Sequence, residues 1–137
     1  MNRKDLQVLA NARMREARAL YKAGEFSGAY HLVGYAVECG LKACIAKKVR
    51  KHDFPDKKGV NDAHTHNLET LCRLADLNGS RLLLEQIDPL FRKNWNLTIR
   101  WSEESRYTII AKPSCKDLMD AIMERSHGIM PWIKQHW

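Results

Sequence analysis

Four polar side chains recur at helical spacing in a stretch that is otherwise apolar. The stretch is residues 29–43, and its polar positions are four, three and four residues apart: His31, Tyr35, Glu38 and Lys42. In an α-helix these side chains share one stripe. A helix that is apolar on its other sides is packed by neighbours, and a buried carboxylate needs a cation or a hydrogen-bond donor. The stripe therefore predicts a polar site on a central helix, with a partner for Glu38 elsewhere in the chain.

Residues 100–107 hold the densest mixture of arginines and aromatic residues in the chain. A guanidinium group flanked by aromatic rings suits contact with a phosphate group together with stacking on a base. We predict that Arg106 pairs with Glu38, either within a ligand site or as a structural ion pair inside a helical bundle. The predicted ligand-binding residues are Glu38, Lys42, Tyr35, Trp101, Arg106 and Tyr107.

His64 and His66 form a His-x-His pair that could bind a metal ion or act as a general acid or base near neutral pH. No cysteine or carboxylate stands at a spacing that completes a metal site, and helix capping or loop packing is the simpler interpretation. The sequence contains no glycine-rich phosphate loop, nucleophile elbow or zinc-protease motif. We predict no metal and no cofactor, and the catalytic candidates are Arg106 and His66.

The positions of apolar residues predict helices that could hold these groups. Residues 5–22 repeat apolar positions every three or four residues, as in an amphipathic helix. Residues 27–51 form the central helix, where three glycines each cost about 1 kcal/mol relative to alanine. Close approach by a neighbouring helix is the expected compensation. Those glycines are Gly28, Gly34 and Gly40.

The rest of the chain predicts shorter elements. Residues 51–65 lack periodicity and indicate a long loop, which is usually functional or mobile. One helix is expected over 68–75, with a stop at 78–80, and a second over 81–93, with a bend at Pro89. A last helix is expected from Ser114 onward, with a bend at Pro131. A short strand could form at 107–110. Together these elements predict an all-α protein with one domain, 1–137. The simplest architecture is an antiparallel up-and-down four-helix bundle with the long loop between its second and third helices.

The chain is basic, with a net charge of +7 and a pI near 9.4, which favours polyanionic partners. The charge is uneven: residues 1–24 hold six basic and two acidic side chains, 41–58 hold seven and two, and 59–90 hold two and five. One basic face or a solvated surface without a polyanion partner would both give this pattern.

The cellular compartment is predicted from what the sequence lacks. The longest uncharged run, 26–37, covers 12 residues, whereas a membrane span needs roughly 20, and the first residues have no secretory apolar core. Four cysteines without C-x-x-C spacing indicate reduced, buried thiols. We therefore expect a cytoplasmic protein without a membrane partner.

Several segments together resemble the HEPN domain family of small, mostly prokaryotic helical bundles. The resemblance covers roughly residues 5–135, and its most specific segment is Ala-Val-Glu-x-x-Leu-Lys-Ala. The matching residues are Gly24, Glu25 and Phe26; Ala36, Val37 and Glu38 with Leu41, Lys42 and Ala43; His66, Asn67 and Leu68 with Leu71; and Trp101 with Arg106 and Tyr107.

This resemblance implies an antiparallel four-helix bundle that usually dimerises and serves nucleotide or RNA transactions. Many relatives are toxin ribonucleases, companions of nucleotidyltransferases or parts of phage-defence systems. Their ribonuclease motif is arginine, four to six residues, then histidine. Counting from Arg106, the histidine would fall at 111–113, where Ala111, Lys112 and Pro113 stand, so the chain lacks the usual motif.

Three functional hypotheses follow. The leading one is a dimeric HEPN-like protein that binds nucleotide or RNA and belongs to a toxin-antitoxin or phage-defence system. The second is a metal-independent endoribonuclease that uses Arg106 with a non-standard histidine, His66 or His64. The third is an interaction module whose C-terminal Trp132 and Trp137 dock on a nucleotidyltransferase.

Overall fold

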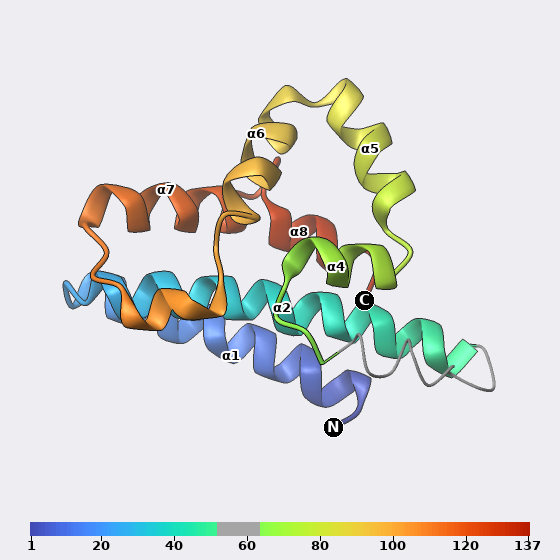
Figure 1. Ribbon diagram of the computed structural model, residues 1–137, viewed down its shortest axis with the longest axis horizontal. Helices are drawn as coiled ribbons and strands as arrows, with labels where there is room; N and C mark the ends of the chain where they lie inside the picture. Colours follow the sequence, from blue (N-terminus) through green and yellow to red (C-terminus); the bar gives the residue numbers. More distant parts are fainter. Residues whose placement is uncertain (52–63) are drawn as a thin grey trace.

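The computed structural model describes residues 1–51 and 64–137, so residues 52–63 of the predicted loop at 51–65 lie outside the described residues. Within them the chain forms seven α-helices and one 3-10 helix and no strand, so the all-α prediction is confirmed. Figure 1 shows their arrangement. The elements are α1 (Arg3–Lys22), α2 (Phe26–Lys51), α4 (Leu68–Leu74), α5 (Asn78–Ile87), α6 (Pro89–Thr98), η1 (Glu103–Tyr107), α7 (Lys112–Met123) and α8 (Ile129–Lys134).

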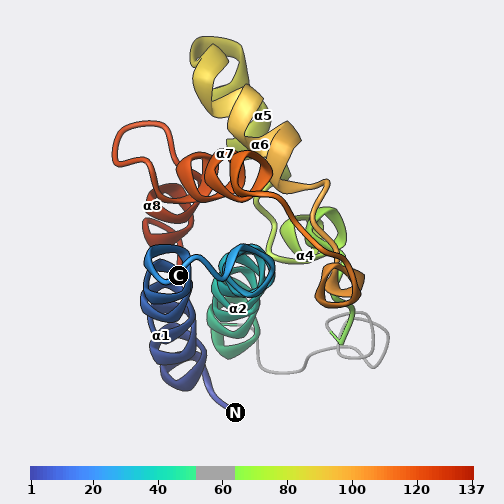
Figure 2. The ribbon, with the colours of Figure 1, turned by 90° about the vertical axis from the view of Figure 1, so that its left-hand side faces the viewer.

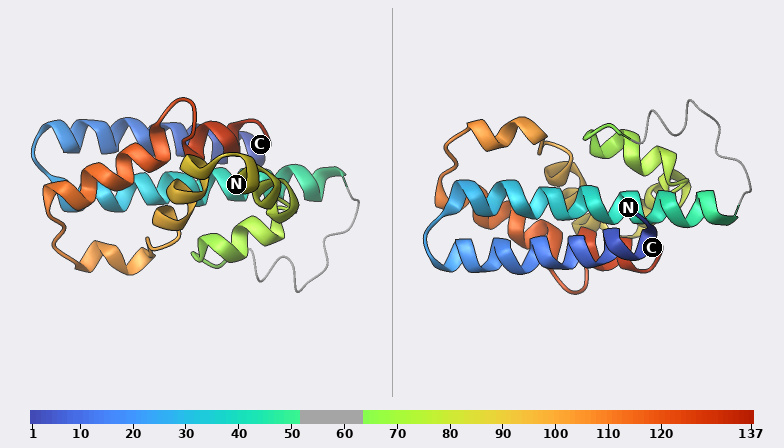
Figure 3. Two further views of the ribbon diagram at one scale, coloured as in Figure 1. Left: turned by 90° about the horizontal axis from the view of Figure 1, so that it is seen from above. Right: turned by 90° about the horizontal axis from the view of Figure 1, so that it is seen from below.

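Helices α1 and α2 run antiparallel and side by side (Figures 1 and 3). Asn2 caps the start of α1 by accepting a hydrogen bond from the Asp5 amide at 2.9 Å, and the Asp5 carboxylate accepts one from the Asn2 amide at 3.0 Å. This reciprocal box satisfies two amides that a helix start leaves without partners. After α1 the chain turns at Gly24, whose φ of +82° favours glycine. Both helices lie where the sequence predicts them.

Helix α2 is the centre of the fold, as predicted. It contacts α1, α4, α7, α8 and η1, and the end-on view in Figure 2 shows α1 on one side of it and α4 on the other, with α7 above. Val33, Val37 and Leu41 on α2 have no exposed surface. Burial on several faces explains why this helix carries apolar residues nearly all round.

The predicted helix at 81–93 is in fact two helices, α5 and α6, which meet at Asp88. The Asp88 Oδ1 accepts a hydrogen bond from the Phe91 amide at 3.0 Å and so caps α6. Pro89 takes the first position of α6, where its missing N–H costs nothing. The prediction that residues 78–80 end a helix was wrong, because Asn78 begins α5.

The apolar residues of α5 and α6 differ widely in burial. Phe91 is buried, but Leu83, Ile87 and Leu90 are exposed. Figure 1 shows α5 standing away from α1 and α2, in keeping with the exposure of Leu83 and Ile87. The α6 helix joins the core through the buried Phe91 and Trp95 rings, and the partly buried Leu84 of α5 packs against it.

The C-terminal region also differs from its prediction. The short strand suggested at 107–110 does not form: Tyr107 ends the 3-10 helix η1, and residues 108–110 have no regular structure. Helix α7 begins before Ser114, with Ala111 at its cap position. The last helix breaks at 124–128, not at Pro131, which lies inside α8. Trp132 is buried, with its ring 5.2 Å from that of Phe91 and 6.1 Å from that of Trp95. The predicted docking role of Trp132 is therefore wrong.

A histidine links the α7–α8 connection to the cap of α6. The Nδ1 of His127 lies 2.7 Å from Asp88 Oδ2. This hydrogen bond raises the pKa of His127 and lowers the pKa of Asp88. A histidine whose pKa is raised in the folded protein stabilises the fold at pH values below its pKa in the unfolded chain. This stabilisation is lost as the pH rises through its pKa in the folded protein.

We expect the wild-type Tm to exceed that of His127→Gln most strongly near pH ~5.5, where Asp88 is charged and His127 is protonated. The Tm difference should shrink as pH rises to ~8, because the histidine loses its proton there. Thermal unfolding across this range measures the difference. A difference that stays constant with pH would contradict the ion pair as its cause.

Candidate functional site

The predicted stripe on α2 contains a buried carboxylate with two partners. Glu38 is 1% exposed. Its Oε2 accepts a hydrogen bond from Lys42 Nζ at 3.2 Å, and its Oε1 lies 3.0 Å from His66 Nδ1. These contacts replace the direct Glu38–Arg106 pair that we predicted. The carboxylate is thus compensated by a lysine on its own helix and a histidine that precedes α4.

His66 connects Glu38 to the 3-10 helix η1. Its Nε2 lies 3.2 Å from Glu103 Oε2, and Glu103 Oε1 lies 3.7 Å from an Arg106 guanidinium nitrogen. The five side chains form a continuous series that we name the ionic chain: Lys42, Glu38, His66, Glu103 and Arg106. Both ring nitrogens of His66 face carboxylates, so the imidazolium form donates at both ends, whereas the neutral ring donates at one.

Local hydrogen bonds position His66 at the start of α4. The Asn67 side chain accepts from the Thr70 amide at 2.9 Å and caps α4, and the Thr65 hydroxyl accepts from the Asn67 amide at 3.1 Å. Polar residues around a helix start are favoured for this reason. The capping that the sequence suggested for this region thus coexists with the contact of His66 to two carboxylates, while His64 is exposed in a turn.

Aromatic rings line the neighbouring part of α2. The His31 ring stacks between Tyr35, at 6.3 Å, and Trp101, at 5.9 Å, and its Nδ1 lies 3.3 Å from the Ser105 hydroxyl. Burial, followed by the charge of Arg106, lowers the pKa of His31. The neutral form of this ring is therefore favoured.

Trp101 lies against α2 at Gly34. A Cβ atom added to Gly34 would lie 2.2 Å from the indole Nε1, far closer than van der Waals contact allows. The prediction of close approach at this glycine is met by a tryptophan side chain from the segment before η1, not by a helix backbone. Because Trp101 lies two residues before the start of η1, this contact holds the start of η1 against α2.

The solvent-facing part of the site is formed by η1. The Arg106 side chain is 50% exposed and its guanidinium carbon lies 4.8 Å from the centre of the Tyr107 ring, which is 78% exposed. Within the described part of the chain, no acceptor hydrogen-bonds the Arg106 guanidinium, and its ion pair to Glu103 is long. A cation beside an aromatic ring is therefore available to a ligand.

The structure brings the six predicted ligand-binding residues to one side of α2, but they differ in burial and therefore in what they can contact. Glu38 and Trp101 are buried and shape the site from behind, whereas Arg106 and Tyr107 face solvent. Lys42 and Tyr35 are partly exposed. Sequence reasoning missed Glu103 and Ser105; the i, i+3 spacing of Glu103 and Arg106 was the available signal for the first.

Other chemistry has less structural support in the described residues. Within 1–51 and 64–137, no three histidine, cysteine, aspartate or glutamate side chains could share a metal ion. The four cysteines are buried and free, as predicted. Burial raises the pKa of Cys39 to about 11 and that of Cys44 to about 12, so these thiols are poor nucleophiles.

Comparisons with protein-family models, curated proteins and solved structures give no match to this chain. No helix among the described residues combines the length and the apolar character that crossing a membrane requires. The interpretation of the site therefore depends on its own geometry.

Proposed function

We propose that the protein is a HEPN-like RNA-binding protein whose RNA site lies on the face formed by α2 and η1. The observation that carries this proposal is the exposed Arg106–Tyr107 pair beside the ionic chain. Arginine donates to phosphate oxygens, and an aromatic ring stacks on any base. Together they suit single-stranded RNA without requiring a particular sequence.

Contacts before, within and after η1 hold the backbone that carries Arg106 and Tyr107. Trp101 packs on Gly34 before η1, and Ser105 contacts His31 within it. After η1, the Ile110 amide donates to the Ser27 hydroxyl at 2.8 Å. A loop segment that is held in place before binding loses less conformational entropy when a ligand arrives.

Anisotropy of a labelled, short single-stranded RNA tests this proposal. We expect Arg106→Ala to weaken binding about tenfold, through the loss of a charge-assisted hydrogen bond. Tyr107→Ala should weaken it at least about fivefold, through the loss of stacking. Affinity should also fall about tenfold between ~50 and ~200 mM salt, since phosphate contacts release counterions.

The matched control is Arg92→Ala, which removes an exposed arginine from α6. It lowers the net charge equally but lies outside the α2–η1 face. If Arg92→Ala and Arg106→Ala weaken binding equally, the net charge of the protein explains the interaction, and the α2–η1 face is not the RNA site. Binding that is insensitive to salt would also contradict the proposal.

RNA cleavage is a second candidate function, because His66 and Arg106 both contact the carboxylate of Glu103. A neutral histidine that releases one of its two carboxylates can accept the proton of a ribose hydroxyl, and an arginine can stabilise charge on the attacked phosphate. This pair would act in place of the missing arginine-to-histidine motif. Incubation of RNA with the purified protein, with His66→Ala and Arg106→Ala as controls, tests it. Intact RNA would exclude this candidate without affecting the binding proposal.

The wider context extends the same proposal. The HEPN resemblance would fit a four-helix bundle made mainly by α1, α2, α6 and the α7–α8 pair. It would also fit a homodimer, and a role in a toxin-antitoxin or phage-defence system with a nucleotidyltransferase partner. With Trp132 buried in the core, the surface for such a partner would have to lie elsewhere. Light scattering tests the dimer, and co-purification with a neighbouring gene product tests the partner.

A further inference from the structure

His66 stands between two carboxylates that differ in exposure. Its Nδ1 lies 3.0 Å from Glu38 Oε1, and its Nε2 lies 3.2 Å from Glu103 Oε2. Glu38 is buried, whereas the Glu103 side chain is 35% exposed. A buried carboxylate that lacks a donor costs more than an exposed one, which water can solvate. When His66 can donate only once, Glu38 therefore takes that hydrogen bond.

The neutral form of His66 cannot hold Glu103 at the same time. In a neutral imidazole one ring nitrogen donates and the other accepts. A proton on Nδ1, where Glu38 needs it, leaves a lone pair on Nε2 that faces the Glu103 carboxylate. Two acceptors repel each other, and the attraction of the positive ring is lost as well. Glu103 is therefore released from His66 when the ring is neutral.

Arg106 is an alternative partner for Glu103. The two residues are three positions apart on η1, and side chains at this spacing lie over one another in a 3-10 helix. One guanidinium nitrogen of Arg106 lies 3.7 Å from Glu103 Oε1, while Glu103 Oε2 faces His66. Once released, the Glu103 carboxylate can pair closely with Arg106 and offset its charge. The charge of His66 thus controls how much of the Arg106 charge is available to a phosphate.

The other charged and titratable groups around His66 do not give this response. Within the described part of the chain, the charged side chains that face its ring are Glu38 and Lys42 from α2 and Glu103 and Arg106 from η1. Lysine and arginine ordinarily keep their charge over the range in which histidine titrates. His31, a second imidazole on this face, has a pKa that burial lowers, so its neutral form is already favoured.

We propose that His66 is a pH-sensitive switch of RNA affinity at the α2–η1 face. In the protonated form it holds both carboxylates, and Arg106 is free to contact a phosphate. In the neutral form it keeps Glu38 and releases Glu103 to Arg106. This inference rests on the proposed RNA function and adds its regulation. Because histidine ordinarily changes charge between about pH 5 and 8, RNA binds more tightly at the acid end of this range.

Anisotropy of the labelled single-stranded RNA, at constant ionic strength and at pH ~5.5 and ~8, tests the switch. We expect the wild type to bind about fivefold more tightly at the lower pH, the effect of one exposed ion pair. His66→Asn keeps an amide donor for Glu38 but cannot be protonated, so it should bind weakly at both pH values. Glu103→Gln removes the carboxylate that is released, so it should bind tightly at both.

The matched control is His64→Asn, which removes an exposed histidine two residues earlier and should keep the pH dependence of the wild type. Thermal unfolding confirms that each variant is folded. Equal wild-type affinity at the two pH values overturns the switch, and so does an unchanged pH dependence in His66→Asn. Absence of RNA binding at both pH values would instead overturn the RNA function on which the switch rests.

NMR of the protein without RNA measures the change of contact directly. The signals of the His66 ring nitrogens and of the Arg106 Nε–H group should change with the same midpoint in a pH titration. The neutral His66 ring should carry its proton on Nδ1, and His66→Asn should remove the change at Arg106. An Arg106 signal that does not follow His66 overturns the exchange of Glu103 between them, whatever the RNA affinities are.

Discussion

Replacing Lys42 with methionine is expected to lower the free energy of unfolding by about 2 to 3 kcal/mol. The substitution leaves the buried Glu38 carboxylate with His66 as its remaining partner. Lys42 Nζ lies 3.2 Å from Glu38 Oε2, and no other described group hydrogen-bonds that oxygen. Methionine keeps the aliphatic length of the lysine, so the packing on α2 changes little. Denaturation by urea measures the effect.

A second variant identifies the uncompensated charge as the cause. The double variant Glu38→Gln, Lys42→Met replaces the carboxylate with a neutral amide of nearly the same shape, so we expect it to be more stable than Lys42→Met alone. Lys116→Met removes an exposed pair with Asp120 at the same i, i+4 separation and should leave the stability nearly unchanged. Equal losses for Lys42→Met and Lys116→Met would contradict burial as the cause.

The long N-terminal helices could be predicted from the sequence because their signals are local. The apolar period of α1 and the nearly continuous apolar surface of α2 each extend over many turns, and the structure has both helices within two residues of the expected bounds. Shorter helices depend on single residues. Asn78 and Gly79 are common where helices stop, yet here they start α5, because the chain turns before them at Asp76, which has a φ of +61°.

The site could be predicted only in part, for a similar reason. Helical spacing places Glu38 and Lys42 on one stripe whatever the rest of the chain does. The contacts of His66 depend on the path that brings the start of α4 beside α2, and no periodicity encodes that path. Its two carboxylate neighbours, Glu38 and Glu103, are therefore found only in three dimensions.

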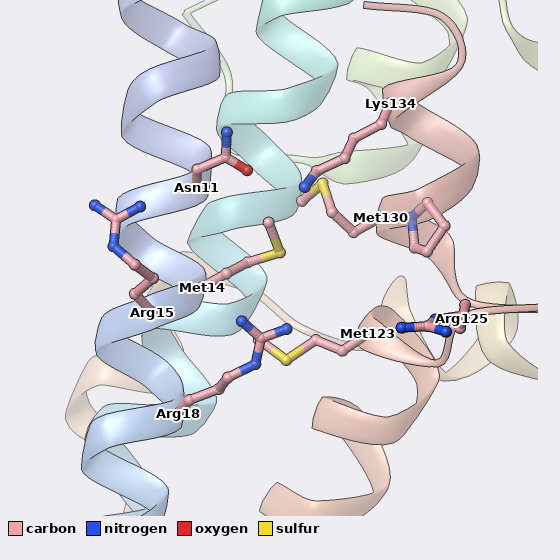
Figure 4. Close-up of a pocket in the computed structure, with 9 residues that line it drawn as sticks. Asn11, Met14, Arg15, Arg18, Met123, Arg125, Met130 and Lys134 are labelled. Atoms are coloured by element: carbon pink, nitrogen blue, oxygen red, sulfur yellow. The ribbon is translucent and has the colours of Figure 1, made fainter.

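The sequence did not predict the pocket between α1 and α8, which Arg18, Arg125 and Lys134 help to line (Figure 4). Arg18 lies in a basic part of the sequence, residues 1–24, but Arg125 and Lys134 are separated by the end of the break at 124–128 and most of α8. A single continuous last helix would not place a turn between them. The pocket therefore depends on the break that replaces the predicted bend at Pro131, and the uneven charge of the sequence did not reveal it.

Substituting Gly34 with alanine is the second change for which we expect a large effect. The new Cβ would lie 2.2 Å from the Trp101 indole, and Trp101 is buried, so the ring has to move. Overpacking of this kind costs about 1 to 3 kcal/mol, and partial exposure of the indole adds to it. Against this stands a gain of about 1 kcal/mol in helix propensity. The expected net loss is about 2 kcal/mol, which urea denaturation measures.

The functional consequence of Gly34→Ala distinguishes a positioning role from simple packing. Movement of Trp101 displaces η1, and with it Arg106 and Tyr107, so RNA affinity should fall even at temperatures where the variant is fully folded. Gly79→Ala is the matched control, because a Cβ there meets nothing within 4 Å, and it should stabilise the protein slightly. If Gly34→Ala lowers stability but leaves RNA affinity unchanged, Trp101 does not position the RNA-binding pair. If Gly34→Ala lowers both stability and RNA affinity, and Gly79→Ala lowers neither of them, the packing of Trp101 on α2 holds Arg106 and Tyr107 in place.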